Sequence, residues 1–167
     1  MAACGTWANG SNVEIAEENM KPRLMVPLKN FHSEEADCSC GCGKITSPEL
    51  MIRLQAFIYY LERIYDCTVR CIITGGARCI KRNTDEYGGK PTPSYHMGRS
   101  RGKVKDEPGE AVDAVFEICP HNDWARISKD QAAQHAIESK LFGGVGWKIY
   151  GPATRFVHLD LGPVRVF

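Results

Sequence analysis

A histidine and an aspartate stand two positions apart in the segment RFVHLDL, residues 155–161. The segment alternates in the manner of a β-strand, which places Phe156, His158 and Asp160 on one face and leaves the other face apolar. A histidine nitrogen and a carboxylate on one face can bind a divalent metal or transfer a proton. This segment is therefore the first place in the chain where chemistry is expected.

A further carboxylate, Asp113, interrupts the apolar run EAVDAVF, residues 110–116. An ionised carboxylate buried in such a strand is costly unless it is paired or bound to a metal. With His96, the chain offers His, Asp and His, and three protein ligands with an open fourth position are typical of catalytic zinc. The residues alone also allow a simpler interpretation, in which His158 and Asp160 form a surface pair and His96 belongs only to a loop.

Helices are expected at two places that could support these strands. Residues 46–66, TSPELMIRLQAFIYYLERIYD, begin with a capping box of Thr46 and Glu49 and carry one apolar face. A second capping box, Ser128 with Gln131, starts a helix that should run to about Leu141. Strands are predicted over residues 68–74, 111–118, 147–150, 155–161 and 164–167.

The order of these elements predicts the fold class. Early helices, late antiparallel strands and the absence of βαβ alternation favour a single α+β domain over residues 26–167, with a central antiparallel sheet and flanking helices. Residues 1–25 are polar and aperiodic, so we expect them to form an N-terminal arm.

Charge and hydropathy narrow the classes of partner. The chain has 21 basic and 20 acidic residues and a net charge of +1, without the basic stripe that nucleic acid requires. No run approaches the roughly 20 apolar residues that span a bilayer. The first residues, MAACGTWANGSN, lack the charged and apolar regions of a signal peptide. We expect neither nucleic acid nor a membrane span as partner, and a monomer by default.

Three of the eight cysteines are crowded into CSCGCG, as Cys38, Cys40 and Cys42. They could contribute to a structural zinc site, although the usual Cys-x₂₋₄-Cys spacing and a second pair are missing. Otherwise the segment is rich in turns and holds small buried thiols. A redox or metal protein built on these cysteines is the least favoured interpretation of the whole chain.

A set of ordered motifs resembles the zinc D-Ala-D-Ala metallopeptidases, the superfamily that also contains murein endopeptidases and shares the hedgehog-like fold. The family pattern is a strand ending in SGYR, an N…GG stretch, SxHxxGxAxD and a final HxD strand. The resemblance covers roughly residues 26–167. The matching stretches are GGARC (75–79) with Asn83, GG (88–89), SYH (94–96), GEAVD (109–113) and FVHLD (156–160).

This resemblance implies a role for each matching residue. His96, Asp113 and His158 would be the ligands of one catalytic Zn²⁺. Arg78 would anchor a carboxylate or carbonyl of the substrate, a role suited to its planar and permanently charged guanidinium. Ser94 would contact the substrate or orient the site beside the first ligand.

Two departures from the family pattern concern the loop and the base. His96 and Asp113 are seventeen positions apart, so about ten residues, 99–108, are inserted between the two halves of the motif. Loop length costs little free energy, so we expect the insertion to reshape the rim of the cleft. Arg155 occupies the position where many relatives carry an acidic catalytic residue. Asp160 is therefore our candidate for the general base or for a carboxylate that orients His158.

The expected function is hydrolysis of peptide bonds in the stem or cross-bridge peptides of peptidoglycan, as a D,D-carboxypeptidase or an endopeptidase. The alternative is a zinc-containing module that binds cell-wall peptide or a protein without cleaving it. Because no export signal is visible, a phage-encoded enzyme that is released by lysis or carried in the virion is an attractive origin.

Overall fold

The structure is a computed structural model that describes residues 33–103, 107–148 and 151–167. Within these ranges it forms one α+β domain with three α-helices and a six-stranded sheet, which confirms the expected fold class. None of the helices described is long and apolar enough to cross a membrane. The predicted arm, residues 1–25, lies outside the described residues.

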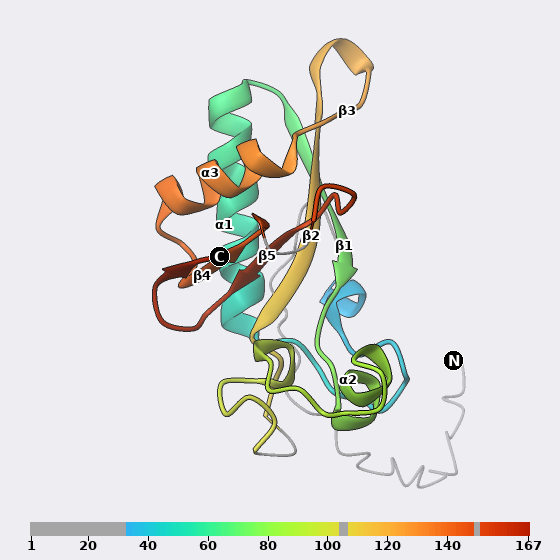
Figure 1. Ribbon diagram of the computed structural model, residues 1–167. Helices are drawn as coiled ribbons and strands as arrows, with labels where there is room; N and C mark the ends of the chain where they lie inside the picture. Colours follow the sequence, from blue (N-terminus) through green and yellow to red (C-terminus); the bar gives the residue numbers. More distant parts are fainter. Residues whose placement is uncertain (1–32, 104–106, 149–150) are drawn as a thin grey trace, which may run out of the picture.

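The helices and strands follow one another as Figure 1 shows. The α-helices are α1 (Pro48–Tyr65), α2 (Ile80–Glu86) and α3 (Lys129–Ser139), and short 3-10 turns are η1 (Ser33–Ala36), η2 (Tyr95–Met97) and η3 (Pro120–Asn122). The strands are β1 (Thr68–Gly75), β2 (Ala111–Cys119), β3 (Ala125–Arg126), β4 (Gly144–Gly146), β5 (Val157–Asp160) and β6 (Arg165–Val166).

The sheet runs in the order β1-β2-β5-β4-β6, and β3 adds to the far end of β2. Its pairs are antiparallel except β4 with β6, which are parallel, so the sheet is mixed and the expectation of an antiparallel sheet is wrong in this detail. The reason is that β4 lies between β5 and β6. After β5 the chain turns and passes β4. Strand β6 then pairs with the far edge of β4 and runs parallel to it.

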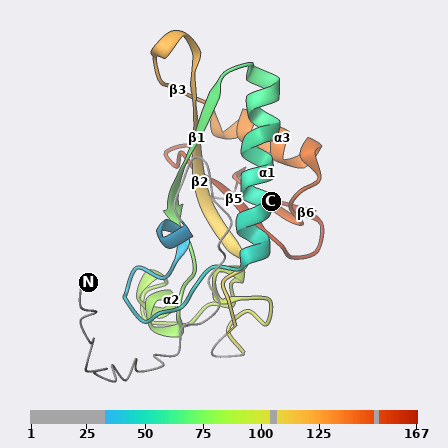
Figure 2. The same ribbon diagram turned by 180° about the vertical axis from the view of Figure 1, so that it is seen from behind.

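One face of the sheet is covered by α1, which packs on the antiparallel strands β1 and β2 (Figure 2). Its apolar stripe is buried, and the ring of Phe57 meets Phe116 of β2 and Phe142 edge-on, at centroid distances of 5.2 and 5.5 Å. Helix α3 packs on α1 and on β4 and β5. These contacts form the core behind the strands that carry the polar residues.

Strand β2 is buried along most of its length, which explains why it reads as nearly continuous apolar sequence. Strand β5 pairs with residues 111–114 of β2 and β1 pairs with residues 113–119, so the two pairings overlap at Asp113 and Ala114. Asp113 is therefore surrounded by paired backbone on both sides, with 6% of its surface exposed. A carboxylate in this position needs charged or polar partners.

Of the two predicted capping boxes, one is absent and one is present. Helix α1 begins after Ser47 without a side-chain cap, so the capping box of Thr46 and Glu49 is not formed. Thr46 is buried and donates its hydroxyl to the carbonyl of Ala36 instead, because tertiary contacts hold the entry to the helix. The capping box of Ser128 and Gln131 at α3 is confirmed.

Of the strand predicted over residues 147–150, residues 149 and 150 lie outside the described residues. Residues 147 and 148 are not in a strand, and β4 forms three residues earlier than predicted. Glycine at 144 and 146 lets β4 fit tightly between β5 and the C-terminus. A Cβ at Gly144 would overlap the carboxylate of Asp160, and one at Gly146 would overlap the ring of Phe167. Close packing, which composition does not reveal, therefore selects two glycines over an apparently better strand former.

Removal of the Phe57 ring should destabilise the domain strongly. Phe57→Ala deletes a fully buried ring that touches two other rings, so we expect a loss of about 3–5 kcal/mol in the free energy of unfolding, measured by denaturant titration. Ile52→Ala on the same helix, at a side chain that is 49% exposed, is the matched control and should change the value by less than about 0.5 kcal/mol. Equal effects of the two substitutions would contradict this description of the core.

Candidate metal centre

Three side chains from separate elements meet at the end of the antiparallel β1–β2 pair nearest η2. Asp113 of β2 and His158 of β5 are direct cross-strand partners, and His96 comes from η2. The Nδ1 atom of His158 lies 2.8 Å from Oδ1 of Asp113, and Nε2 of His96 lies 3.4 Å from Oδ2. All three side chains are buried, and their ligand atoms lie within 4.8 Å of one another. The structure thus brings together the three predicted ligands.

The position of His96 is fixed by the backbone around η2. Ser94 caps this turn, since its Oγ accepts a hydrogen bond from the His96 N–H at 3.3 Å. The His96 carbonyl accepts from Arg78 N–H at 2.8 Å, and the Tyr95 carbonyl accepts from Glu110 N–H at 2.8 Å. Ser94 is therefore adjacent to the first ligand, as predicted, and the contact it makes here is with the backbone.

The landmark Asn83 has a structural role in bringing this turn to the site. It is fully buried in α2, and its Oδ1 accepts a hydrogen bond from the Thr92 N–H at 2.8 Å. This bond holds the segment that precedes Ser94 against α2. The sequence motif is therefore partly a device for placing His96.

Each histidine has a partner for the ring nitrogen that faces away from Asp113. Nδ1 of His96 lies 2.7 Å from the Gly76 carbonyl oxygen, to which it can only donate. Nε2 of His158 lies 3.1 Å from Oδ2 of Asp160. Metal-binding histidines usually donate their second N–H to a carbonyl or carboxylate, which fixes the tautomer and directs the other nitrogen to the metal. Both rings are held in that way.

Asp160 is completely buried behind His158. Its Oδ2 accepts from His158 and, at 2.5 Å, from Nη2 of Arg165, while Oδ1 accepts from the Gly162 N–H at 2.7 Å. Both oxygens are therefore engaged, and the ring of His158 separates them from the ligand atoms. Of the two roles predicted for Asp160, these contacts favour orientation of His158 over proton transfer.

Arg78 lies beside the cluster, directly after the end of β1. Its Nη2 donates to Oδ2 of Asp113 at 3.2 Å, and its side chain is 13% exposed. Gly75 makes this approach feasible, because a Cβ there would lie 2.8 Å from Oδ2 of Asp113. A guanidinium has five N–H donors, so the contact with Asp113 leaves others for a second carboxylate. Arg155, by contrast, is exposed.

Charge in the site favours the anionic form of Asp113. Burial opposes ionisation, but His96 and His158 outweigh it and hold the pKa of this carboxyl well below its usual range. Burial also opposes protonation of His158, yet Asp113 and Asp160 on its two sides raise its pKa to about 8. Asp113 is thus an ionised candidate ligand flanked by cationic or polar groups. Without a metal, protonated His158 compensates the charge of this carboxylate, and a bound divalent cation would do so instead.

The residues fit a zinc ion. Tetrahedral zinc with ligand bonds of 2.0–2.2 Å separates its ligand atoms by about 3.3–3.6 Å, close to the 3.4 Å between His96 and Asp113. The 2.8 Å between His158 and Asp113 is a hydrogen-bond distance, so an ion would have to replace that hydrogen bond. Two imidazole nitrogens and one carboxylate oxygen are a donor set of catalytic zinc sites, and both histidines have the outer partners that such sites need. Arg78, whose Nη2 donates to Oδ2 of Asp113, provides a positive charge next to the cluster.

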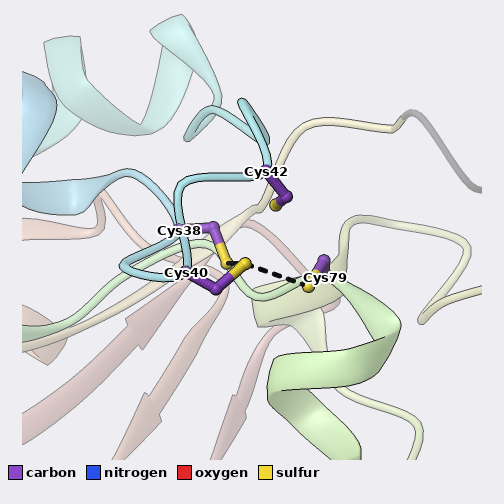
Figure 3. A group of neighbouring side chains, drawn as sticks. All are labelled: Cys38, Cys40, Cys42 and Cys79. Carbon is purple, nitrogen blue, oxygen red and sulfur yellow. Dashed lines mark hydrogen bonds between the residues drawn. The ribbon is translucent and has the colours of Figure 1, made fainter.

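A second cluster with metal-binding side chains lies close by, and sequence reasoning found only part of it. Cys79 joins Cys38, Cys40 and Cys42, and the four sulfur atoms lie within 4.8 Å of one another (Figure 3). Cys79 follows Arg78 directly but is 37 positions from Cys42. No local spacing connects it to the others, so only the path of the chain reveals the fourth member.

The inserted residues line a cleft next to the His96 turn. The cleft has a volume of about 670 Å³ and begins at Met97, the residue after His96. Its inserted side contains Arg99, Arg101 and Lys103, and its other wall is formed by Ile80, Pro91 and Pro93. The insertion therefore contributes basic side chains to a cleft that reaches Met97, next in sequence to His96. That this cleft belongs to the metal centre stays a prediction.

Comparison of the chain with protein-family models, with curated proteins and with solved structures finds no match. The geometry of the described residues and the sequence motifs therefore carry the functional inference.

The contact between Asp160 and His158 can be tested through metal affinity. Asp160→Asn keeps the shape of the side chain but removes its charge, and loss of such outer partners typically lowers metal affinity about 10–100-fold. We expect a fall of that size in zinc affinity, measured by competition with a chromogenic chelator. Asp123→Asn, at an exposed carboxylate beyond β2, is the matched control and should bind like the wild type. An unchanged affinity of the Asp160 variant would rule out the orienting role.

Proposed function

We propose that this protein is a zinc-dependent peptidase that hydrolyses peptide bonds in peptidoglycan, with the hedgehog-like fold of the D-Ala-D-Ala metallopeptidases. The observation that carries the proposal is the cluster of His96, Asp113 and His158 with an outer partner on each histidine. The order of the sequence motifs, from GGARC to FVHLD, supports the same superfamily.

The ion at this centre would be Zn²⁺, held by His96 Nε2, His158 Nδ1 and a carboxylate oxygen of Asp113. When bound, it would supply a Lewis acid and a water molecule of lowered pKa. Hydrolysis adds the hydroxyl of water to the scissile carbonyl carbon and a proton to the departing nitrogen. The protein's own contribution is to hold the two imidazole rings in the required tautomers and to keep Asp113 ionised.

Substrate binding would fall to Arg78 and the neighbouring basic rim. The guanidinium of Arg78 is fixed by Asp113 and retains N–H donors that match a carboxylate in a planar, bidentate fashion. Stem peptides of peptidoglycan carry free carboxylates, and Arg99 and Arg101 lie in the adjacent cleft. This arrangement favours a substrate whose anionic group lies within a few residues of the bond that is cut.

Proton transfer is assigned less directly. Asp113 is a proposed ligand, and Asp160 would have to leave both Arg165 and Gly162 before it could accept a proton. Arg155 cannot act as a base at working pH. These observations support a second candidate function, a zinc-containing module that binds cell-wall peptide without cleaving it.

Digestion of purified muropeptides separates the two functions. The zinc-loaded protein should release new peptide products, resolved by mass spectrometry, because the proposed zinc ligands and Arg78 are all in place. His158→Ala should abolish both product formation and zinc retention at this centre. His121→Ala, at an exposed histidine of η3, is the matched control and should remain active. Measurable binding of muropeptides by the wild type, without any product, would favour the binding module.

Shortening of the insertion should change selectivity and spare the metal. Lys44 Nζ donates to the carbonyls of Met97, at 3.0 Å, and Glu107, at 2.5 Å, so the insertion leaves and re-enters the domain at one point. Replacement of residues 99–106 by two glycines should therefore leave zinc affinity within about threefold of the wild type, since loop length costs little.

The same variant should show an altered ranking of muropeptide substrates, because it loses the basic side of the cleft. Substitution of Arg99 and Arg101 by Gln in the full-length chain is the control that removes charge without removing the loop. Loss of zinc from the shortened variant would mean that His96 is the wrong histidine to pair with Asp113.

A further inference from the structure

Four cysteine side chains from two distant segments converge beside the proposed catalytic centre. Cys38, Cys40 and Cys42 lie in the loop between η1 and α1, and Cys79 lies between β1 and α2 (Figure 3). Their sulfur atoms are all within 4.8 Å of one another, with 3.4 Å between Cys38 and Cys40 and 3.5 Å between Cys40 and Cys79. Such a group of four thiols is unusual unless something binds it.

The distances between the sulfur atoms match metal coordination and not a disulfide. A disulfide bond joins its sulfurs at about 2.0 Å, whereas all four of these cysteines are free thiols. Tetrahedral Zn²⁺ with Zn–S bonds of 2.3 Å places its sulfurs about 3.8 Å apart, which lies inside the observed spread. The cluster is therefore close to the arrangement that a metal would require, without rearrangement of the backbone.

The loop that carries three of the cysteines is shaped to present them together. Gly41 and Gly43 have φ values of 72° and 73°, a left-handed conformation that glycine adopts without strain. The Cys38 N–H donates to the Lys44 carbonyl at 2.9 Å, which closes the loop on itself. Gly41, between Cys40 and Cys42, and Gly43, directly after Cys42, thus let the chain turn back so that the three thiols lie together.

The second segment is fixed against the first by backbone contacts. Ala77 N–H donates to the Ala36 carbonyl at 2.7 Å, and a Cβ at Gly76 would overlap the backbone of Ala36. Cys79 follows two residues later and begins α2 as its N-cap. The fourth thiol is thus held in position by the path of the chain from β1.

The described part of this region has little apolar packing to hold it. Cys40 and Cys42 are exposed, and the core cluster extends to Ala36 but includes none of the four cysteines. A short loop without a core usually needs a cross-link or a metal to persist. A metal bound by the four thiols would join the loop to residues 76–79.

We propose that Cys38, Cys40, Cys42 and Cys79 bind a structural Zn²⁺ ion, separate from the centre at His96, that fastens residues 38–42 to the segment carrying Arg78. Four thiolates close the coordination shell and leave no position for water or substrate, which is the property of structural zinc and not of catalytic zinc. Each thiol loses its proton when the ion binds. This inference does not depend on the proposed peptidase activity.

Cobalt substitution of the full-length protein tests the proposal directly, because thiolate-to-cobalt charge transfer gives an absorption that nitrogen and oxygen ligands do not. The wild type loaded with Co²⁺ should show this absorption at an intensity appropriate to four thiolates. Cys79→Ser should lose most of it and should retain one ion fewer per chain. Cys67→Ser, which removes a thiol outside the cluster, is the matched control and should keep both the absorption and the ion.

Cys42→Ser guards against failure to fold, because Cys42 is exposed and its substitution leaves the core intact. It should weaken the charge-transfer absorption in a protein whose circular dichroism is unchanged. His158→Ala should lose the other ion and keep the absorption, which distinguishes the two sites. An absorption that persists in Cys79→Ser, or a wild type with no such absorption, would overturn the proposal. A loss of two free thiols in the purified wild type would point to a disulfide instead and would overturn it equally.

Discussion

The pairing of Asp113 with His158 across β2 and β5 is the contact on which the candidate metal centre depends. It places an ionised carboxylate inside a strand that is hydrogen-bonded on both sides and almost completely buried. An isolated buried charge of this kind is strongly unfavourable, so the surrounding structure has to supply compensating partners. His158, His96 and Arg78 all do so, and two of these three come from outside the sheet. The charge of one residue thereby organises three segments of the chain.

The segments outside the sheet are held by backbone hydrogen bonds more than by apolar packing. Arg78 N–H bonds to the His96 carbonyl, Glu110 N–H to the Tyr95 carbonyl, and Ala77 N–H to the Ala36 carbonyl. None of these bonds involves the inserted residues, and Lys44 closes the base of the insertion. We therefore expect the geometry around His96 to tolerate changes in the length of the chain between the two halves of the motif. Variation there can change the cleft without reaching the ligands.

Much of the fold and of the site could be predicted from the sequence because the signals are local. The apolar stripe of α1, the apolar run around Asp113 and the capping box at Ser128 each depend on neighbours a few positions away. The role of Thr46, the parallel pairing of β6 and the position of β4 could not be predicted, since tertiary contacts decide them. The part of Cys79 in the cysteine cluster could not be predicted for the same reason, because only the folded chain brings its three partners to it.

The contacts of Asp160 show a related limit. Its place on the same strand face as His158 was visible in the alternation, but the direction of its oxygens was not. Only the contacts with His158, Arg165 and Gly162 show that both oxygens are engaged and that the ring of His158 lies between them and the ligand atoms. Asp113 and Asp160 thus lie on opposite sides of the His158 ring, although Asp160 and His158 share a strand face.

The peptide at Gly76 has a consequence for how the two clusters behave together. Its carbonyl orients His96, and its lack of a side chain lets the neighbouring backbone lie against Ala36, two residues before Cys38. Both clusters therefore depend on the order of one peptide unit. If both clusters hold an ion, order imposed on this peptide by one ion would also be present at the other cluster, so the two metal affinities would be thermodynamically linked, and by reciprocity each ion would favour the binding of its neighbour to the same extent.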